Sequence, residues 1–424
     1  MSTFADLLQF RMQPRTFYIT NIGRLYCDEE GLTAPLKGAS MSQLPFIESA
    51  WLLIENGKFH SWGSMSLFPE TSISAHDATN GWVIPAWCDS HTHLVYAGSR
   101  ETEFVARING LTYEEIAQQG GGIINSALRL RNTTEDQLYD SALIRLHEII
   151  QFGTGAVEIK SGYGLDLESE LKMLRVIRRL KSATNCEIRS NFLAAHAVPP
   201  EYKGRQDDYV NHIINDMLPK VVEEGLADFI DVFCDRGFFT QGNTEKILSA
   251  GMKYGLRGKI HANELDYSGG VQAGVKYGAL SVDHLECVGE AEITALLNSQ
   301  TISTVLPSTS FFLKLPYAPA RKMIDAGLPL SLATDYNPGS SPSGRMSFIL
   351  SLACIHMNML PEEAVNAATI NGACAMGVEM EFGSIAKNKF ANCLITQPLE
   401  NLAYIPYSFG SDLVKKVILK GEMQ

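Results

Sequence analysis

Two histidines separated by one residue, His91 and His93, follow a short run of apolar, β-branched and aromatic residues at 81–87. In an extended chain alternate side chains point to the same face, roughly 6.5 Å apart along the strand. The pair can therefore hold one metal ion at a strand end, and imidazole suits Zn(II), Fe(II), Ni(II) or Cu(II) better than Mg(II). Because one His-x-His pair is weak evidence, the metal-site hypothesis depends on further ligands elsewhere.

Polar residues also end several later runs of apolar, strand-like sequence. They are His196, His261, Glu264, His284 and Asp335. Active-site residues of a parallel β/α barrel gather at the carboxyl ends of its strands, so we expect these side chains to meet. The predicted metal ligands are His91, His93, His261 and Asp335. Three imidazoles and one carboxylate are typical of a site that keeps a position for water, whose pKa the ion lowers from 15.7 to about 7.

The elements that must position these residues alternate between strand-like runs and segments of helical periodicity. The strand-like runs lie at 153–160, 187–198, 228–234, 257–264, 280–286, 302–307 and 328–335. Several helical segments between them end near a glycine. This alternation predicts the α/β class, and at this strand count it favours a closed (β/α)8 barrel of the TIM type over an open sheet.

Both ends of the chain have a different pattern. Residues 15–85 and the stretch after 376 contain short β-branched and aromatic runs separated by Asn-Gly and Gly turns. We therefore predict a small β-sandwich domain composed of 1–85 and 376–424, beside a metal-dependent barrel hydrolase domain at 86–375.

Composition narrows the class of protein. The chain has 424 residues, of which 45% are hydrophobic, and no apolar run reaches the length of about 18 residues that a membrane span needs. We expect a soluble, cytoplasmic enzyme that does not bind membranes. Eight scattered cysteines without a Cys-x-x-Cys motif argue against disulfides and thiolate zinc sites. A net charge of −12 without a basic cluster argues against nucleic acid as a partner.

Some residues allow two interpretations. Lys160 ends a strand-like run, where a carbamylated lysine can bridge two metals, although a salt bridge is the favoured alternative. The glycines at 120–122 can cradle a phosphate or form a tight turn. Asp89 can orient the metal-binding histidines or cap a backbone amide. The remaining histidines are assigned to structure or solvent: His60, His76, His147, His212 and His356.

The strand-end ligands and the β domain from both ends resemble the amidohydrolase superfamily. Seven motifs resemble the imidazolonepropionase family, which catalyses the third step of histidine degradation: HTHLVYAGSRETEF (91–104), AQQGGGIINS (117–126), VEIKSGYGLD (157–166), FLAAHAVPPEY (192–202), IHANEL (260–265), VDHLE (282–286) and ATDYNPGSSP (333–342). The clearest departure is PAWCD before the histidine pair, where the family usually has PGLVD; it removes no ligand.

The resemblance implies hydrolysis of the ring amide of a small anion, 4-imidazolone-5-propanoate, to N-formimidoyl-L-glutamate. It also implies one Zn(II) or Fe(III) ion per chain, held by the four predicted ligands, and a homodimer. The implied substrate-binding residues are Arg100, Tyr113, Tyr163, His196, Glu264, Asn337, Gly339 and Ser340. A guanidinium suits the propanoate group and tyrosine hydroxyls add donors. The backbone amides at 337–340 either face the substrate or form an ordinary loop.

For the chemical step we expect His284, helped by Glu264, to take a proton from water and later to protonate the leaving ring nitrogen. Asp335 can share the base role, and the sequence does not divide the work among these three. The metal or His196 stabilises the oxyanion. Two alternatives stay open: a related deaminase that acts on another nitrogen heterocycle, and a non-catalytic assembly protein of the same fold.

Overall fold

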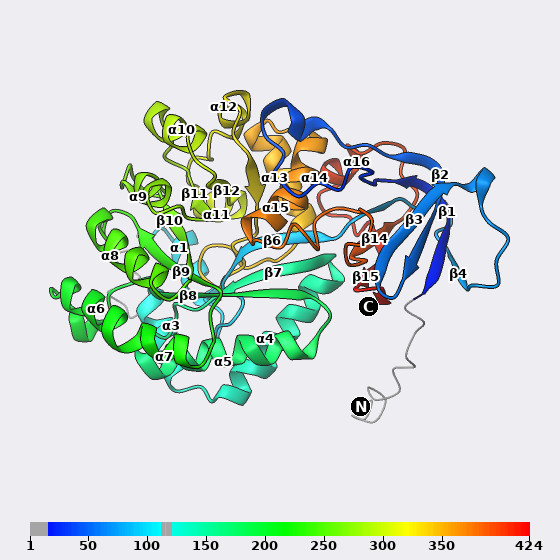
Figure 1. Ribbon diagram of the computed structural model, residues 1–424. Helices are drawn as coiled ribbons and strands as arrows, with labels where there is room; N and C mark the ends of the chain where they lie inside the picture. Colours follow the sequence, from blue (N-terminus) through cyan, green and yellow to red (C-terminus); the bar gives the residue numbers. More distant parts are fainter. Residues whose placement is uncertain (1–15, 112–114, 116–120) are drawn as a thin grey trace.

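A parallel barrel forms the larger part of the molecule. The computed structural model describes residues 16–111, 115 and 121–424, and its barrel strands neighbour one another in chain order (Figure 1). The strands are β6 (Trp87–Thr92), β7 (Thr154–Lys160), β8 (Glu187–Ala195), β9 (Phe229–Cys234), β10 (Arg257–Ala262), β11 (Ser281–His284), β12 (Ile302–Val305) and β13 (Leu330–Leu332). The predicted α/β barrel is confirmed.

The barrel closes through residues of the predicted site. The first and last strands meet where the amide of Asp335 donates to the carbonyl of His91 at 3.0 Å. One step further, the amide of His93 donates to the carbonyl of Tyr336 at 2.9 Å. Barrel closure therefore holds the histidine pair and Asp335 next to each other.

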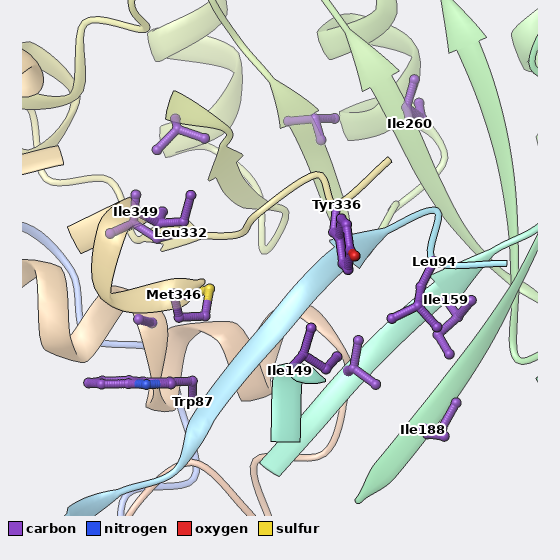
Figure 2. Packing of buried hydrophobic residues seen from close by; sticks show 14 of the residues in the cluster. Trp87, Leu94, Ile149, Ile159, Ile188, Ile260, Leu332, Tyr336, Met346 and Ile349 are labelled. Atoms are coloured by element: carbon purple, nitrogen blue, oxygen red, sulfur yellow. The ribbon is translucent and has the colours of Figure 1, made fainter. Parts of the chain in front are cut away.

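Helices surround the barrel, and the longest of them bury an apolar face against it. The helices are α1 (Glu101–Ile108), α3 (Gly122–Arg131), α4 (Glu135–Gln151), α5 (Leu167–Ala183), α6 (Gln206–His212), α7 (Leu218–Glu223), α8 (Gln241–Met252), α9 (Gly270–Lys276), α10 (Glu290–Leu297), α11 (Pro307–Leu313), α12 (Ala320–Asp325), α13 (Met346–Met357), α14 (Pro361–Ala368), α15 (Ile370–Ala375) and α16 (Tyr404–Tyr407). Thr134 caps α4 through the amide of Gln137, as expected of threonine at a helix start. Figure 2 shows Ile149 of α4 and Ile159 of β7 in one buried cluster.

Both ends of the chain form a second sheet beside the barrel (Figure 1). Its strands are β1 (Phe17–Leu25), β2 (Ile47–Glu55), β3 (Lys58–Ser64), β4 (Ala75–Asp77), β5 (Val83–Pro85), β14 (Cys393–Thr396), β15 (Val414–Leu419) and β16 (Glu422–Met423). Asn56 and Gly57, which join β2 to β3, have φ values of 53° and 78°, the conformation that an Asn-Gly hairpin turn requires. The predicted β structure built from both ends is confirmed.

The structure divides two segments that are continuous in the sequence pattern. The run at 81–87 is not one strand, because the amide of Ala86 still donates to Asn392 of the terminal sheet, whereas that of Trp87 donates to Gly153 beside β7. The helical segment near 208–225 is divided by a π-helical turn, Ile213–Met217, ahead of Pro219, which has no amide proton to donate. None of the described helices has the length and hydropathy of a membrane span.

Candidate metal centre and active site

Three of the predicted metal ligands meet inside the carboxyl end of the barrel. One ligand nitrogen from each of His91, His93 and His261 lies within 4.8 Å of the other two, and all three residues are buried. Nε2 of His93 and Nε2 of His261 are 3.3 Å apart. Ligands at about 2.0–2.1 Å from a tetrahedral ion are about 3.3–3.4 Å from each other, so this spacing fits Zn(II).

Asp335 joins the histidines as the fourth predicted ligand. Its Oδ1 lies 3.5 Å from Nε2 of His91 and 3.5 Å from Nε2 of His93. The other oxygen, Oδ2, accepts a hydrogen bond from the Thr309 hydroxyl at 2.5 Å. Asp335 lies beyond the end of β13 with φ of 52°, a strained conformation for a residue with a side chain. Closure of the barrel and the Thr309 contact stabilise this conformation and direct Oδ1 toward the histidines.

Two buried aspartates orient the histidine rings. Nδ1 of His91 is 2.7 Å from Asp283, and Nδ1 of His261 is 3.1 Å from Asp231. A histidine that donates its Nδ1 proton to a carboxylate presents an unprotonated Nε2 to a metal. Within the described residues, Nε2 of His91 is buried with no hydrogen-bond partner. The donor set therefore fits a metal ion.

The electrostatics favour the neutral, ligating form of the histidine pair. Burial lowers the pKa of both His91 and His93 well below the ordinary value, and the neighbouring cationic groups lower it further. Neutral imidazole is the form that coordinates metals. Asp231 and Asp283 were missed at the sequence level. Each could have been recognised as a carboxylate within an otherwise apolar, buried strand: Asp231 in FIDVFC and Asp283 in SVDH.

The predicted proton-transfer pair lies beside the metal ligands. Nδ1 of His284 is 3.6 Å from Oε2 of Glu264 and 3.8 Å from Oε2 of Glu286. Burial opposes the charge on His284, but the two carboxylates outweigh it and raise its pKa to about 10. Burial raises the pKa of Glu264 to about 7, although His284 opposes this shift. Glu286 was not predicted, and it lies two residues beyond His284 in the same motif.

Three predicted substrate-binding residues line one side of the centre. The His196 ring stacks on His93 with centroids 5.0 Å apart, and its Nδ1 donates to the carbonyl of Gly162 at 3.1 Å. Burial lowers the pKa of His196 to about 3, so its ring is neutral. The Tyr163 ring centroid is 5.8 Å from that of His93 and 5.9 Å from the guanidinium carbon of Arg100. The guanidinium and the tyrosine therefore lie on the same side of the ligands.

The turn that carries Tyr163 is held by a buried carboxylate that sequence analysis did not single out. Glu170, in the first turn of α5, accepts hydrogen bonds from the amides of Gly162 at 3.1 Å, Gly164 at 2.8 Å and Leu165 at 2.9 Å. Three amide donors fix the path of the chain between β7 and α5. This bonding explains why the KSGYGLD segment forms a defined turn at the site.

The comparisons with known proteins agree with this geometry. The amidohydrolase family model matches residues 82–423. Imidazolonepropionases from Flavobacterium johnsoniae and Clostridium tetani are 52% and 43% identical, over 96% and 91% of this chain and 99% and 93% of theirs. The chain belongs to the imidazolonepropionase family of amidohydrolases. The predicted resemblance and the hydrolase class are confirmed.

Solved structures show the same fold at low identity. An adenosine deaminase from Xanthomonas campestris has a TM-score of 0.70 at 16% identity, over 97% of this chain and 93% of that one. The E. coli guanine deaminase has a TM-score of 0.74 at 13% identity, over 97% of this chain and 99% of that one. These likenesses show the fold alone, whereas the imidazolonepropionase relatives identify the family.

The turn after Asp335 is held by hydrogen bonds to the Asn337 side chain. The amides of Gly339 and Ser340 donate to Oδ1 of Asn337 at 2.7 and 2.8 Å, and Nδ2 of Asn337 donates to the carbonyl of Asp335 at 2.6 Å. These two amides are bonded within the turn, as in the ordinary-loop alternative, and the role of Asn337, Gly339 and Ser340 in substrate binding stays a prediction. Gly339 nevertheless borders Arg100, because a Cβ added to it would lie 2.5 Å from Nη1 of Arg100.

The structure shows where the residues lie for which the sequence allowed two interpretations. Lys160 forms ion pairs with Glu158 and Asp231, which is the favoured alternative to carbamylation. Asp89 accepts hydrogen bonds from the amide and hydroxyl of Thr334, so it caps the chain beyond β13 rather than orienting a histidine. Tyr113 and Gly120 lie outside the described residues, and the amide of Gly122 donates to Glu103. The other five histidines lie in the terminal sheet or in helices: His60, His76, His147, His212 and His356.

Proposed function

We propose that this chain hydrolyses the ring amide of 4-imidazolone-5-propanoate to N-formimidoyl-L-glutamate. The convergence of His91, His93, His261 and Asp335 on one centre carries the proposal, and the family assignment supports it. The substrate requires a cation for its propanoate group. Arg100 is suited to this role, because its Nε donates to Ser126 at 2.9 Å and thereby fixes the guanidinium.

The four predicted ligands would hold one Zn(II) or Fe(III) ion per chain, which when bound acidifies water and polarises a carbonyl. Glu264, with its pKa near 7, accepts the proton of the attacking water at neutral pH. His284 keeps a proton near its carboxylate neighbours and donates it to the leaving ring nitrogen. Glu264 and His284 have different roles because their environments leave one group able to accept a proton and the other protonated at neutral pH. Because the Nδ1 proton of neutral His196 is donated to the Gly162 carbonyl, its Nε2 is unprotonated and can accept a hydrogen bond from an N–H of the substrate but cannot donate one to an oxyanion.

The experiment that tests the proposal joins metal analysis to an ultraviolet assay of imidazolonepropionate loss. We expect one ion per chain and turnover of this substrate, with no release of ammonia from guanine or adenosine. Deaminase activity with no imidazolonepropionate loss would favour the related deaminase. A metal-free protein with neither activity would favour the assembly protein. The homodimer and the cytoplasmic location stay predictions.

The pH dependence of kcat/KM is expected to be bell-shaped. Activity should rise as the pH passes about 7, because Glu264 then loses the proton that blocks its base role. Activity should fall at alkaline pH as His284, whose pKa its carboxylate neighbours raise to about 10, loses its proton. In the Glu264→Gln variant the acidic limb should disappear. A wild-type limb near the ordinary glutamate pKa would contradict this assignment.

Gly339→Ala is expected to raise KM about tenfold with little change in stability. The added methyl group would lie 2.5 Å from Nη1 of Arg100, so the flexible guanidinium must move away from its present position. One displaced charge-assisted contact corresponds to about 1.5 kcal/mol. Gly410→Ala is the matched control, since no atom lies within 4 Å of its added Cβ. Steady-state kinetics in which both variants match the wild-type KM would argue against Arg100 as the anion-binding group.

A further inference from the structure

Five fully buried charged side chains lie in the barrel beneath the metal ligands. They are Glu158, Lys160, Asp231, Lys259 and Asp283, and we call them the buried charge layer. They come from β7, β9, β10 and β11 and comprise three carboxylates and two ammonium groups. Burying charges is costly unless they are paired, so such a layer requires a physical reason.

Lys160 occupies a special place in this layer. Its Nζ is 2.7 Å from Oδ2 of Asp231 and 3.6 Å from Oδ2 of Asp283. These are the two carboxylates that accept the Nδ1 protons of His261 and His91. One ammonium group therefore joins the carboxylates behind two metal ligands that are far apart in the sequence and lie on non-adjacent strands.

Lys259 has the same charge and burial and shares Glu158 with Lys160, whose Nζ is 2.6 Å from Oε1 of Glu158, but its other partners differ. Its Nζ contacts Oε2 of Glu158 and donates to the carbonyls of Ser90 at 3.0 Å and Ala375 at 3.2 Å. It is 3.9 Å from Asp283, the outer limit of an ion pair. Lys160 bonds directly to one of the histidine-orienting carboxylates, whereas Lys259 is mainly tied to Glu158 and the backbone.

We propose that Lys160 is a positioning residue that holds Asp231 and Asp283 so that Nε2 of His261 and Nε2 of His91 face one metal ion. This role for Lys160 rests on one part of the proposed function, namely that the site binds a metal ion. Asn191 supports the same arrangement, since its Nδ2 donates to Glu158 at 2.8 Å and to Asp231 at 3.0 Å. Lys160 acts through these carboxylates and does not touch the substrate.

The test compares Zn(II) affinity in Lys160→Met and Lys259→Met. The full-length proteins are stripped with a chelator, and Zn(II) is titrated against a chromophoric competitor. We expect Lys160→Met to weaken Zn(II) binding about 10- to 100-fold, as loss of a ligand-orienting contact does, and Lys259→Met to weaken it by less than about threefold. The melting temperature of the metal-free protein should be lower in both variants than in wild type, because each variant loses a buried ion pair. Equal losses of Zn(II) affinity would overturn the proposal.

A double variant, Lys160→Met with Glu158→Gln, tests whether Lys160 acts by holding the two aspartates or only through the net charge of the layer. It removes one positive and one negative charge, so the layer keeps its native net charge, and it is the variant to measure if Lys160→Met alone does not fold. We expect its Zn(II) affinity to stay about 10-fold or more below wild type, because Asp231 and Asp283 still lack their shared partner. Recovery of wild-type affinity would overturn the positioning role. Failure of the wild-type chain to bind Zn(II) would instead overturn the proposed function.

Discussion

The His261→Ala variant is expected to lose its bound metal and to hydrolyse imidazolonepropionate at least about a thousandfold more slowly than wild type. His261 supplies one of three buried nitrogens that converge on the centre, and its ring is held by Asp231. Activation of water by a metal contributes several kcal/mol to the rate, and each 1.36 kcal/mol corresponds to a tenfold change. Metal content measured by mass spectrometry and the ultraviolet assay check this expectation together.

The matched control for this substitution is His60→Ala. The side chain of His60 is 47% exposed on the terminal sheet, so its removal should change neither metal content nor activity. Retention of a full metal equivalent by folded His261→Ala would contradict the assigned ligand set. Circular dichroism of both variants shows whether the fold is intact.

The second large effect is expected from His284→Gln. This variant should keep its metal while kcat falls about 10²- to 10⁴-fold, the usual contribution of a positioned acid or base. The reason is that His284 lies beside Glu264 and Glu286 at 3.6 and 3.8 Å and carries a proton that glutamine cannot transfer. The fall in kcat/KM at alkaline pH should be absent from the His284→Gln variant.

His147→Gln is the control for the proton-transfer role, because His147 is exposed on α4. Its metal content, kcat and pH profile should match wild type. Loss of metal in His284→Gln equal to that in His261→Ala would assign His284 to the ligand set instead. An unchanged alkaline limb would assign the donated proton to another group.

Much of the fold was predictable because its signals are local and periodic. Alternating strand and helix patterns from 86 to 375 follow from the side-chain periods of the two structures. The His91 and His93 pair was recognisable because residues two apart share a strand face. His261 and His284 were recognisable because each ends an apolar run, and the ends of parallel strands meet at one rim.

The site residues that were missed are those whose meaning depends on partners distant in the chain. Asp231 and Asp283 read as isolated charges in apolar strands, and only the barrel register brings them to Lys160, whose partners the sequence did not identify. The sequence left two alternatives for the turn at 337–340 for the same reason, and the structure shows the amides of Gly339 and Ser340 bonded to the Asn337 side chain. Hydrogen-bond partners across a turn depend on dihedral angles that the residue types do not specify.

By itself the sequence determined which residue types end the strands, and hence the chemistry of the ligands, because strand periodicity is a property of neighbouring residues. Only the tertiary structure decided that Asp335 meets the histidines. Its position depends on closure of β13 against β6 and on a backbone conformation with φ of 52° beyond the strand end. Likewise, only the folded barrel places Lys160 between the carboxylates behind His91 and His261, because strands that are remote in the chain pair there in one register.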